Sequence, residues 1–70
     1  FDLIVANILA QPLIDLAPQI ANALANDGNV VLSGLLNTQA DAVVAAYRAQ
    51  GITPVKRLEI GDWTTLVMKG

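Results

Sequence analysis

The stretch that decides the fold is Asp2-Leu3-Ile4-Val5-Ala6-Asn7-Ile8-Leu9. Residues 3–6 form a continuous apolar run with β-branched side chains, which is typical of a strand covered on both faces by helices. Asn7 interrupts the run with an amide that can both donate and accept hydrogen bonds. Ligands of open α/β sheets bind at the carboxyl ends of the strands, so Asn7 is a candidate site residue. The alternative is that Asn7 caps the next helix or closes a turn.

After Asn7 the apolar residues follow steps of three and four, which predicts an amphipathic helix over about 11–26. The members of its buried stripe are Leu13, Leu16, Ala17, Ile20, Ala21 and Leu24. Pro12 suits the first turn of a helix, but Pro18 would remove a backbone donor from the middle. We therefore expect a break near Ala17, with Pro18 beginning a second segment.

A second α/β unit follows. The turn at residues 26–29 should place Gly28 in the left-handed conformation, and a second central strand is predicted over 29–35, parallel to the first. Thr38-Gln39-Ala40-Asp41 has the spacing of a capping box and predicts a helix over 38–50. Gly51 should end this helix in a Schellman arrangement. Tyr47 could donate a proton, but its spacing from two valines favours a place in the core.

The last third of the chain has the period of two that is typical of strands. Strands are predicted over 53–60 and 63–69, joined by a two-residue type II′ turn at Gly61-Asp62. Pro54 indicates an edge strand, because it lacks a backbone donor. Trp63 could offer a stacking surface, but a lone Trp at a hairpin is more often a packing residue.

Composition limits the functions that the chain can have. Its 70 residues suffice for one small domain, and they include no Cys and no His. Disulfides, thiol nucleophiles, imidazole bases and zinc sites are thereby excluded, and we expect no bound metal. Hydrophobic residues make up 54% and charged residues 14%. This apolar surplus, without a run long enough to span a membrane, predicts a single fragment over 1–70 of a larger α/β protein.

The net charge is −2, and the four basic residues are dispersed along the sequence. Nucleic-acid binding normally requires clustered Lys and Arg, so we expect no nucleic acid partner. The Lys56-Arg57 pair is interpreted as a solvated strand face.

Three segments carry a resemblance to a known family: residues 2–9, Gln11-Pro12-Leu13 and Leu32-Ser33-Gly34-Leu35-Leu36. They are similar to the ribosomal protein L11 methyltransferases (PrmA type), which are class I S-adenosylmethionine-dependent enzymes. The resemblance implies a three-layer α/β fold, of which this chain is the C-terminal half of a Rossmann-like sheet. The implied element order is strand, helix, strand, helix and antiparallel hairpin, with the strands arranged first, second, fourth, third.

The same resemblance implies a cytoplasmic enzyme that methylates amino groups of a ribosomal protein, with S-adenosylmethionine as its cofactor. It assigns Asn7 a catalytic and cofactor-binding role and places Ile8 and Leu9 along the approach of the amine. Related amino-methylating enzymes have Asn-Pro-Pro-Tyr where this chain has Asn7-Ile8-Leu9. Ser33 and Gly34 would face the same rim, although turn chemistry explains Gly34 equally well.

The chain has neither a Gly-rich loop nor a following acidic residue for a cofactor ribose, so we expect it to be inactive by itself. Two alternatives stay open. One is a fragment of a nicotinamide-dependent Rossmann enzyme, although its last strand would be parallel. The other is a non-catalytic module that self-associates. In every case the unpaired edge of the first strand predicts a homodimer or a larger oligomer.

Overall fold

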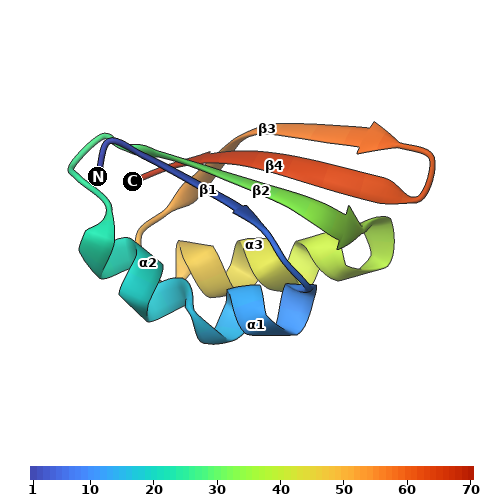
Figure 1. Cartoon of the computed structure of the whole chain (residues 1–70), viewed down its shortest axis with the longest axis horizontal. Coiled ribbons are helices and arrows are strands. Elements are labelled where there is room, and N and C mark those ends of the chain that lie inside the picture. The colour runs from blue at the N-terminus through green and yellow to red at the C-terminus, as the bar shows by residue number, and fades with distance from the viewer.

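The computed structural model describes residues 1–70 as a four-stranded mixed sheet with helices packed against it (Figure 1). The elements are β1 (Leu3–Asn7), α1 (Ala10–Asp15), α2 (Ala17–Ala23), β2 (Asn29–Leu36), the 3-10 helix η1 (Asn37–Gln39), α3 (Ala40–Arg48), β3 (Thr53–Ile60) and β4 (Trp63–Lys69). The sheet order is β1-β2-β4-β3. Strand β1 is parallel to β2, and β4 is antiparallel to both of its neighbours. The predicted α/β class, strand order and terminal hairpin are confirmed.

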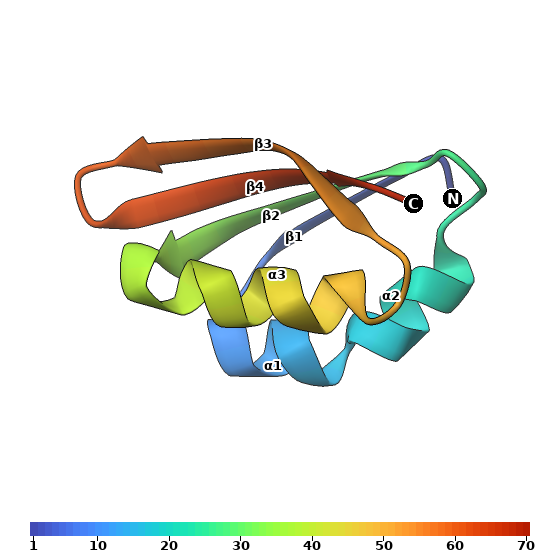
Figure 2. The ribbon, with the colours of Figure 1, turned by 180° about the vertical axis from the view of Figure 1, so that it is seen from behind.

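The chain forms two layers, not three. Figures 1 and 2 show all the helices on one face of the sheet, and the opposite face is bare. In β1 the side chains of Ile4 and Ala6 pack against the core, whereas Leu3 is 57% exposed and Val5 is 64% exposed. The expectation that this strand is covered on both faces is wrong for this chain, because no element of residues 1–70 reaches the second face.

The predicted break in the first helical region is confirmed. Helix α1 ends at Asp15, and α2 begins at Ala17 with Pro18 in its first turn. A proline is tolerated there because the first turn of a helix needs no backbone donor at that place. Leu16 lies at the break and is 40% exposed. Its predicted place in the buried stripe is wrong, since the break interrupts the helical period on which that prediction rested.

The end of α3 has the predicted Schellman geometry. The Ile52 amide donates to the Tyr47 carbonyl at 3.0 Å, and the Gly51 amide donates to the Arg48 carbonyl at 2.9 Å. Gly51 has φ 80°, a conformation that glycine adopts without a steric penalty. Ile52 is buried, so it fastens the end of the helix to the core.

Two local predictions are wrong. In the turn before β2, Asp27 has the left-handed φ of 61°, and Gly28 is needed for another reason. A Cβ on Gly28 would lie 2.9 Å from the Ala25 carbonyl oxygen and 2.8 Å from Leu24 Cδ1. In addition, no capping box forms over residues 38–41. Helix α3 begins at Ala40, and Gln39 Oε1 instead accepts a hydrogen bond from the Leu36 amide at 3.1 Å.

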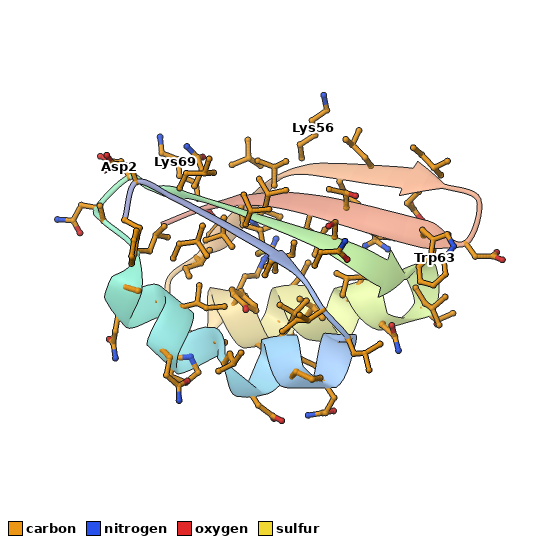
Figure 3. All side chains as sticks on the ribbon, in the orientation of Figure 1. Asp2, Lys56, Trp63 and Lys69 are labelled. Carbon is orange, nitrogen blue, oxygen red and sulfur yellow. The ribbon has the colours of Figure 1, made fainter.

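The hairpin between β3 and β4 has the predicted two-residue turn. Ile60 pairs with Trp63, and Gly61 has φ 59° as a type II′ turn requires. Strand β3 lies at the sheet edge, which accommodates Pro54 as predicted. Trp63 lies near the hairpin tip (Figure 3) and is 57% exposed, so its expected packing role is not seen in this chain.

Tyr47 joins α3 to α1 inside the core. Its side chain is fully buried, and its hydroxyl donates to the Leu13 carbonyl at 2.9 Å. The predicted core role is therefore confirmed. Burial disfavours the phenolate and raises the pKa of Tyr47 to about 12. The other large, fully buried side chains are Leu13, Val30, Leu32, Leu35, Val43, Ile52, Thr64, Leu66 and Met68.

The raised pKa of Tyr47 makes stability depend on pH. The unfolded chain has the usual tyrosine pKa of 10.0, so the stabilisation from the retained proton is complete below pH 10 and is lost as the pH rises toward 12. We expect the free energy of unfolding to fall by up to about 1.4 kcal/mol per pH unit in that window. Urea titrations of the chain and of Tyr47→Phe measure this loss. Tyr47→Phe should not show this loss of unfolding free energy at high pH. If the stability of both proteins fell in parallel with pH, the loss would not come from Tyr47.

Candidate functional site

The candidate site lies where the two parallel strands end together. Asn7 is the last residue of β1, and it stands opposite Ser33 of β2 in the parallel register. A pair of parallel strands presents its carboxyl ends at one edge of the sheet, which is where α/β proteins bind ligands. The structure therefore brings Asn7 and Ser33 together as the sequence predicted.

The side chain of Asn7 forms no hydrogen bond within the chain. Helix α1 has Leu9 at its N-cap, without a side-chain cap. None of the side-chain hydrogen bonds in the structure involves Asn7, which is exposed to solvent. The alternative explanation, in which Asn7 caps a helix or closes a turn, finds no support. The amide remains available to bind a ligand through a donor, an acceptor or both.

A bulge in β2 lies beside Asn7. Leu32 pairs with Leu66 and Leu35 pairs with Thr64, so two residues of β2, Ser33 and Gly34, oppose a single residue of β4. Such bulges bend a strand and re-aim its side chains, and they are frequent next to functional sites. The pairing of β2 with β4 is non-local, and the local sequence therefore gave no sign of the bulge.

Gly34 is in contact with the candidate residue. Its φ is 81°, and a Cβ built on it would overlap Asn7 Oδ1. Gly34 therefore belongs to a strand bulge. The interpretation from sequence that explained Gly34 by turn chemistry is not supported. The absence of a side chain at this position makes room for the Asn7 amide.

Ile8 and Leu9 connect β1 to α1, and both expose much of their apolar surface. Ile8 is 41% exposed and Leu9 is 75% exposed. The next residue, Ala10, is buried and anchors the start of α1 against the core. An apolar segment thus directly follows the polar amide of Asn7, and this order of residues could line the path of an incoming side chain.

An apolar hollow lies elsewhere, along the unpaired side of β1. It has a volume of about 350 Å³, and its lining residues are Phe1, Leu3, Ile4, Gln19, Ile20 and Ala23. Leu3 and Ile4 belong to the amino end of β1, which Phe1 precedes, and the other three residues belong to α2. The hollow is therefore a feature of the free edge of the sheet and is separate from the polar site at Asn7.

Three of the four basic residues, Arg48, Lys56 and Arg57, border one groove between α3 and β3. Arg57 is engaged there, because it forms an ion pair with Asp41 at 2.8 Å that raises its pKa further. Lys56 extends from β3 away from the helices (Figure 3). Of these three cations, Arg57 is the one that acidic side chains pair with.

No three His, Cys, Asp or Glu side chains gather into a group that could hold a metal ion. None of the helices has the length and apolarity needed to cross a membrane.

Alanine variants of two asparagines test whether the Asn7 side chain contributes to stability. Asn37 Nδ2 donates to the Gly61 carbonyl at 2.9 Å, and its Oδ1 accepts from the buried Thr64 hydroxyl. Asn37→Ala should destabilise the chain by about 1–3 kcal/mol, because it leaves Thr64 without its acceptor. Asn7→Ala should change stability by less than about 0.5 kcal/mol. Urea denaturation measures both, and a large loss from Asn7→Ala would restore its structural role.

The whole chain is similar in sequence to a known protein family. The sequence model of the family described as ribosomal protein L11 methyltransferase (PrmA) matches residues 1–70. A protein named ribosomal protein L11 methyltransferase from Brucella suis is 55% identical over 69 residues, covering 99% of this chain and 24% of the relative. One of the same name from Bradyrhizobium diazoefficiens is 52% identical over 69 residues, covering 99% of this chain and 23% of the relative.

Similarity extends to the three-dimensional structure. A crystal structure of ribosomal protein L11 methylase from Lactobacillus delbrueckii subsp. bulgaricus matches with a TM-score of 0.92 and 38% identity, covering 97% of this chain and 35% of that one. This chain spans about a quarter of the length of the curated relatives. The family match over the whole chain sets aside the nicotinamide-enzyme alternative, as does the antiparallel β4. The chain belongs to the ribosomal protein L11 methyltransferase (PrmA) family.

Proposed function

We propose that this chain is the C-terminal half of the catalytic domain of an S-adenosylmethionine-dependent protein methyltransferase, and that it supplies the target-amine side of the active site. The observation that carries the proposal is the unbonded amide of Asn7 at the carboxyl ends of β1 and β2. The named relatives support a methyltransferase, and the bare sheet face supports a larger domain.

Asn7 has the chemistry that transfer to an amine requires. The methyl donor supplies an electrophilic methyl group, and the attacking amine must be neutral, desolvated and aligned with it. The Asn7 oxygen can accept a hydrogen bond from the amine or from the ammonium group of the cofactor. Its nitrogen is free to donate a second hydrogen bond. Asn7 is thus both the catalytic and the cofactor-binding residue of the proposal.

Ile8 and Leu9 form the apolar part of the proposed site. They follow Asn7 directly and remain exposed in this chain, so a lysine side chain or a terminal amine could pass over them. Apolar walls exclude water from the approach and favour the neutral form of the amine, because burial penalises the charged form. We therefore assign these two residues to substrate binding.

Most of the cofactor site would lie outside residues 1–70. The free amide of Asn7 fits one polar contact with S-adenosylmethionine, but the five glycines are too dispersed to form a Gly-rich loop. We expect the isolated chain to be inactive and to bind the cofactor at best weakly. The remaining contacts would come from the rest of the catalytic domain.

The proposed substrate is ribosomal protein L11, which the names of the relatives specify. We therefore expect the enzyme to act in the cytoplasm, with a protein partner in preference to a nucleic acid or a membrane. The ion pair of Arg57 with Asp41 agrees with this expectation, because it leaves few cations for phosphate binding.

Kinetics of the full-length protein test the role of Asn7. Asn7→Ala should lower kcat/KM for methyl transfer to L11. The decrease should correspond to a loss of about 2–4 kcal/mol of transition-state stabilisation, the range expected for one oriented polar group. The matched control is Asn29→Ala, an exposed asparagine at the other end of the parallel strand pair. Normal turnover by Asn7→Ala would refute the proposed catalytic role.

Self-association of the isolated chain is a second proposal, and it rests on the edge strand. Strand β1 pairs only with β2, so its outer backbone donors and acceptors are open. No Lys or Pro protects this edge, and the adjoining hollow is apolar. A second copy could satisfy the open edge by antiparallel pairing about a two-fold axis.

Sedimentation equilibrium over a wide concentration range tests this proposal. We expect a homodimer or a larger oligomer, and we expect Val5→Lys to weaken it, because Val5 is 64% exposed on the bare face. Ile4→Lys is a poorer probe, since Ile4 packs against the core. A monodisperse monomer at high concentration would refute the proposal.

A further inference from the structure

We propose that Gly34 is a positioning residue of the methyltransferase site. Because it has no side chain, it leaves free the space that the Asn7 amide occupies, and so it fixes the orientation of that amide. The inference rests on the proposed function, because it concerns the residue that orients the proposed catalytic group. It assigns a role to the β2 bulge, which lies in the strand next to Asn7 and not in the segment that contains it.

The geometry gives Gly34 two separate constraints. Its φ of 81° is a backbone conformation that side chains disfavour, and the place of its missing Cβ is already taken by Asn7 Oδ1. The positive φ is a requirement of the β2 bulge. The missing Cβ is a requirement of the proposed site. Any residue with a side chain would have to displace the Asn7 amide, the strand, or both.

The second constraint distinguishes Gly34 from the other glycines with positive φ. Gly51 has φ 80° and Gly61 has φ 59°, and a Cβ added to either would meet no atom within 4 Å. Backbone conformation alone explains those two glycines. Only at Gly34 does the missing side chain coincide with a polar atom of the proposed site.

Displacement of Asn7 matters because the amide has no other anchor. It forms no side-chain hydrogen bond, so its direction is set by the strand and by its contact with Gly34. A misplacement of about 1 Å near the reacting atoms can lower a rate by about 100-fold. A methyl group at position 34 would therefore reduce turnover through Asn7, without contacting the substrate itself.

The test compares alanine variants of the full-length protein at two glycines that have nearly the same positive φ, 81° at Gly34 and 80° at Gly51. Gly34→Ala introduces strain together with the clash, and Gly51→Ala introduces the strain alone. We expect similar losses of thermal stability from the two variants. We expect kcat/KM for L11 methylation to fall about 10- to 100-fold in Gly34→Ala, mostly through kcat, and to change less than about twofold in Gly51→Ala.

A double-mutant cycle completes the experiment. If Gly34 acts through Asn7, Gly34→Ala should have almost no further effect on turnover in an Asn7→Ala background. Equal turnover of Gly34→Ala and Gly51→Ala would overturn the inference, and so would an undiminished effect of Gly34→Ala in the Asn7→Ala background. Either result leaves the proposed role of Asn7 standing if Asn7→Ala is itself impaired. A fully active Asn7→Ala would refute both proposals.

Discussion

Strand β2 is the constraint on which the rest of the structure depends, because it alone joins the parallel and antiparallel parts of the sheet. It pairs with β1 in one direction and with β4 in the other. Its Val30, Leu32 and Leu35 side chains are fully buried under the helices. A shift in its register would therefore expose the core and separate Asn7 from its neighbour across the strand pair.

The β2 bulge allows one strand to meet two separate structural requirements. On its β4 side the strand must return Leu35 to the buried face, and on its β1 side it must leave room for an amide. An extra residue in the strand satisfies the first demand, and a glycine within the bulge satisfies the second. Packing of the core and shape of the proposed site are in this way set by the same two residues, Ser33 and Gly34.

The bare sheet face explains the unusual composition. Alternating side chains on the helix side of β4, such as Leu66 and Met68, are fully buried, while Val5 and Trp63 remain exposed on the other side. Hydrophobic residues make up 54% of the chain, yet the helices of the chain cover only one face. Large contiguous apolar surfaces of this kind are normally covered by other protein.

Local sequence patterns determined the element order, the break at Leu16, the Schellman end of α3 and the hairpin turn. Each depends on residues close together in the chain, and proline and glycine restrict the local backbone strongly. The resemblance gave the strand order and named Asn7. Tertiary structure decided what those residues have beside them: the one-sided cover of β1, the exposure of Trp63, and the contact of Gly34 with Asn7. Such contacts join segments far apart in sequence, and their geometry follows from the pairing of β2 with both neighbours, which no local pattern encodes.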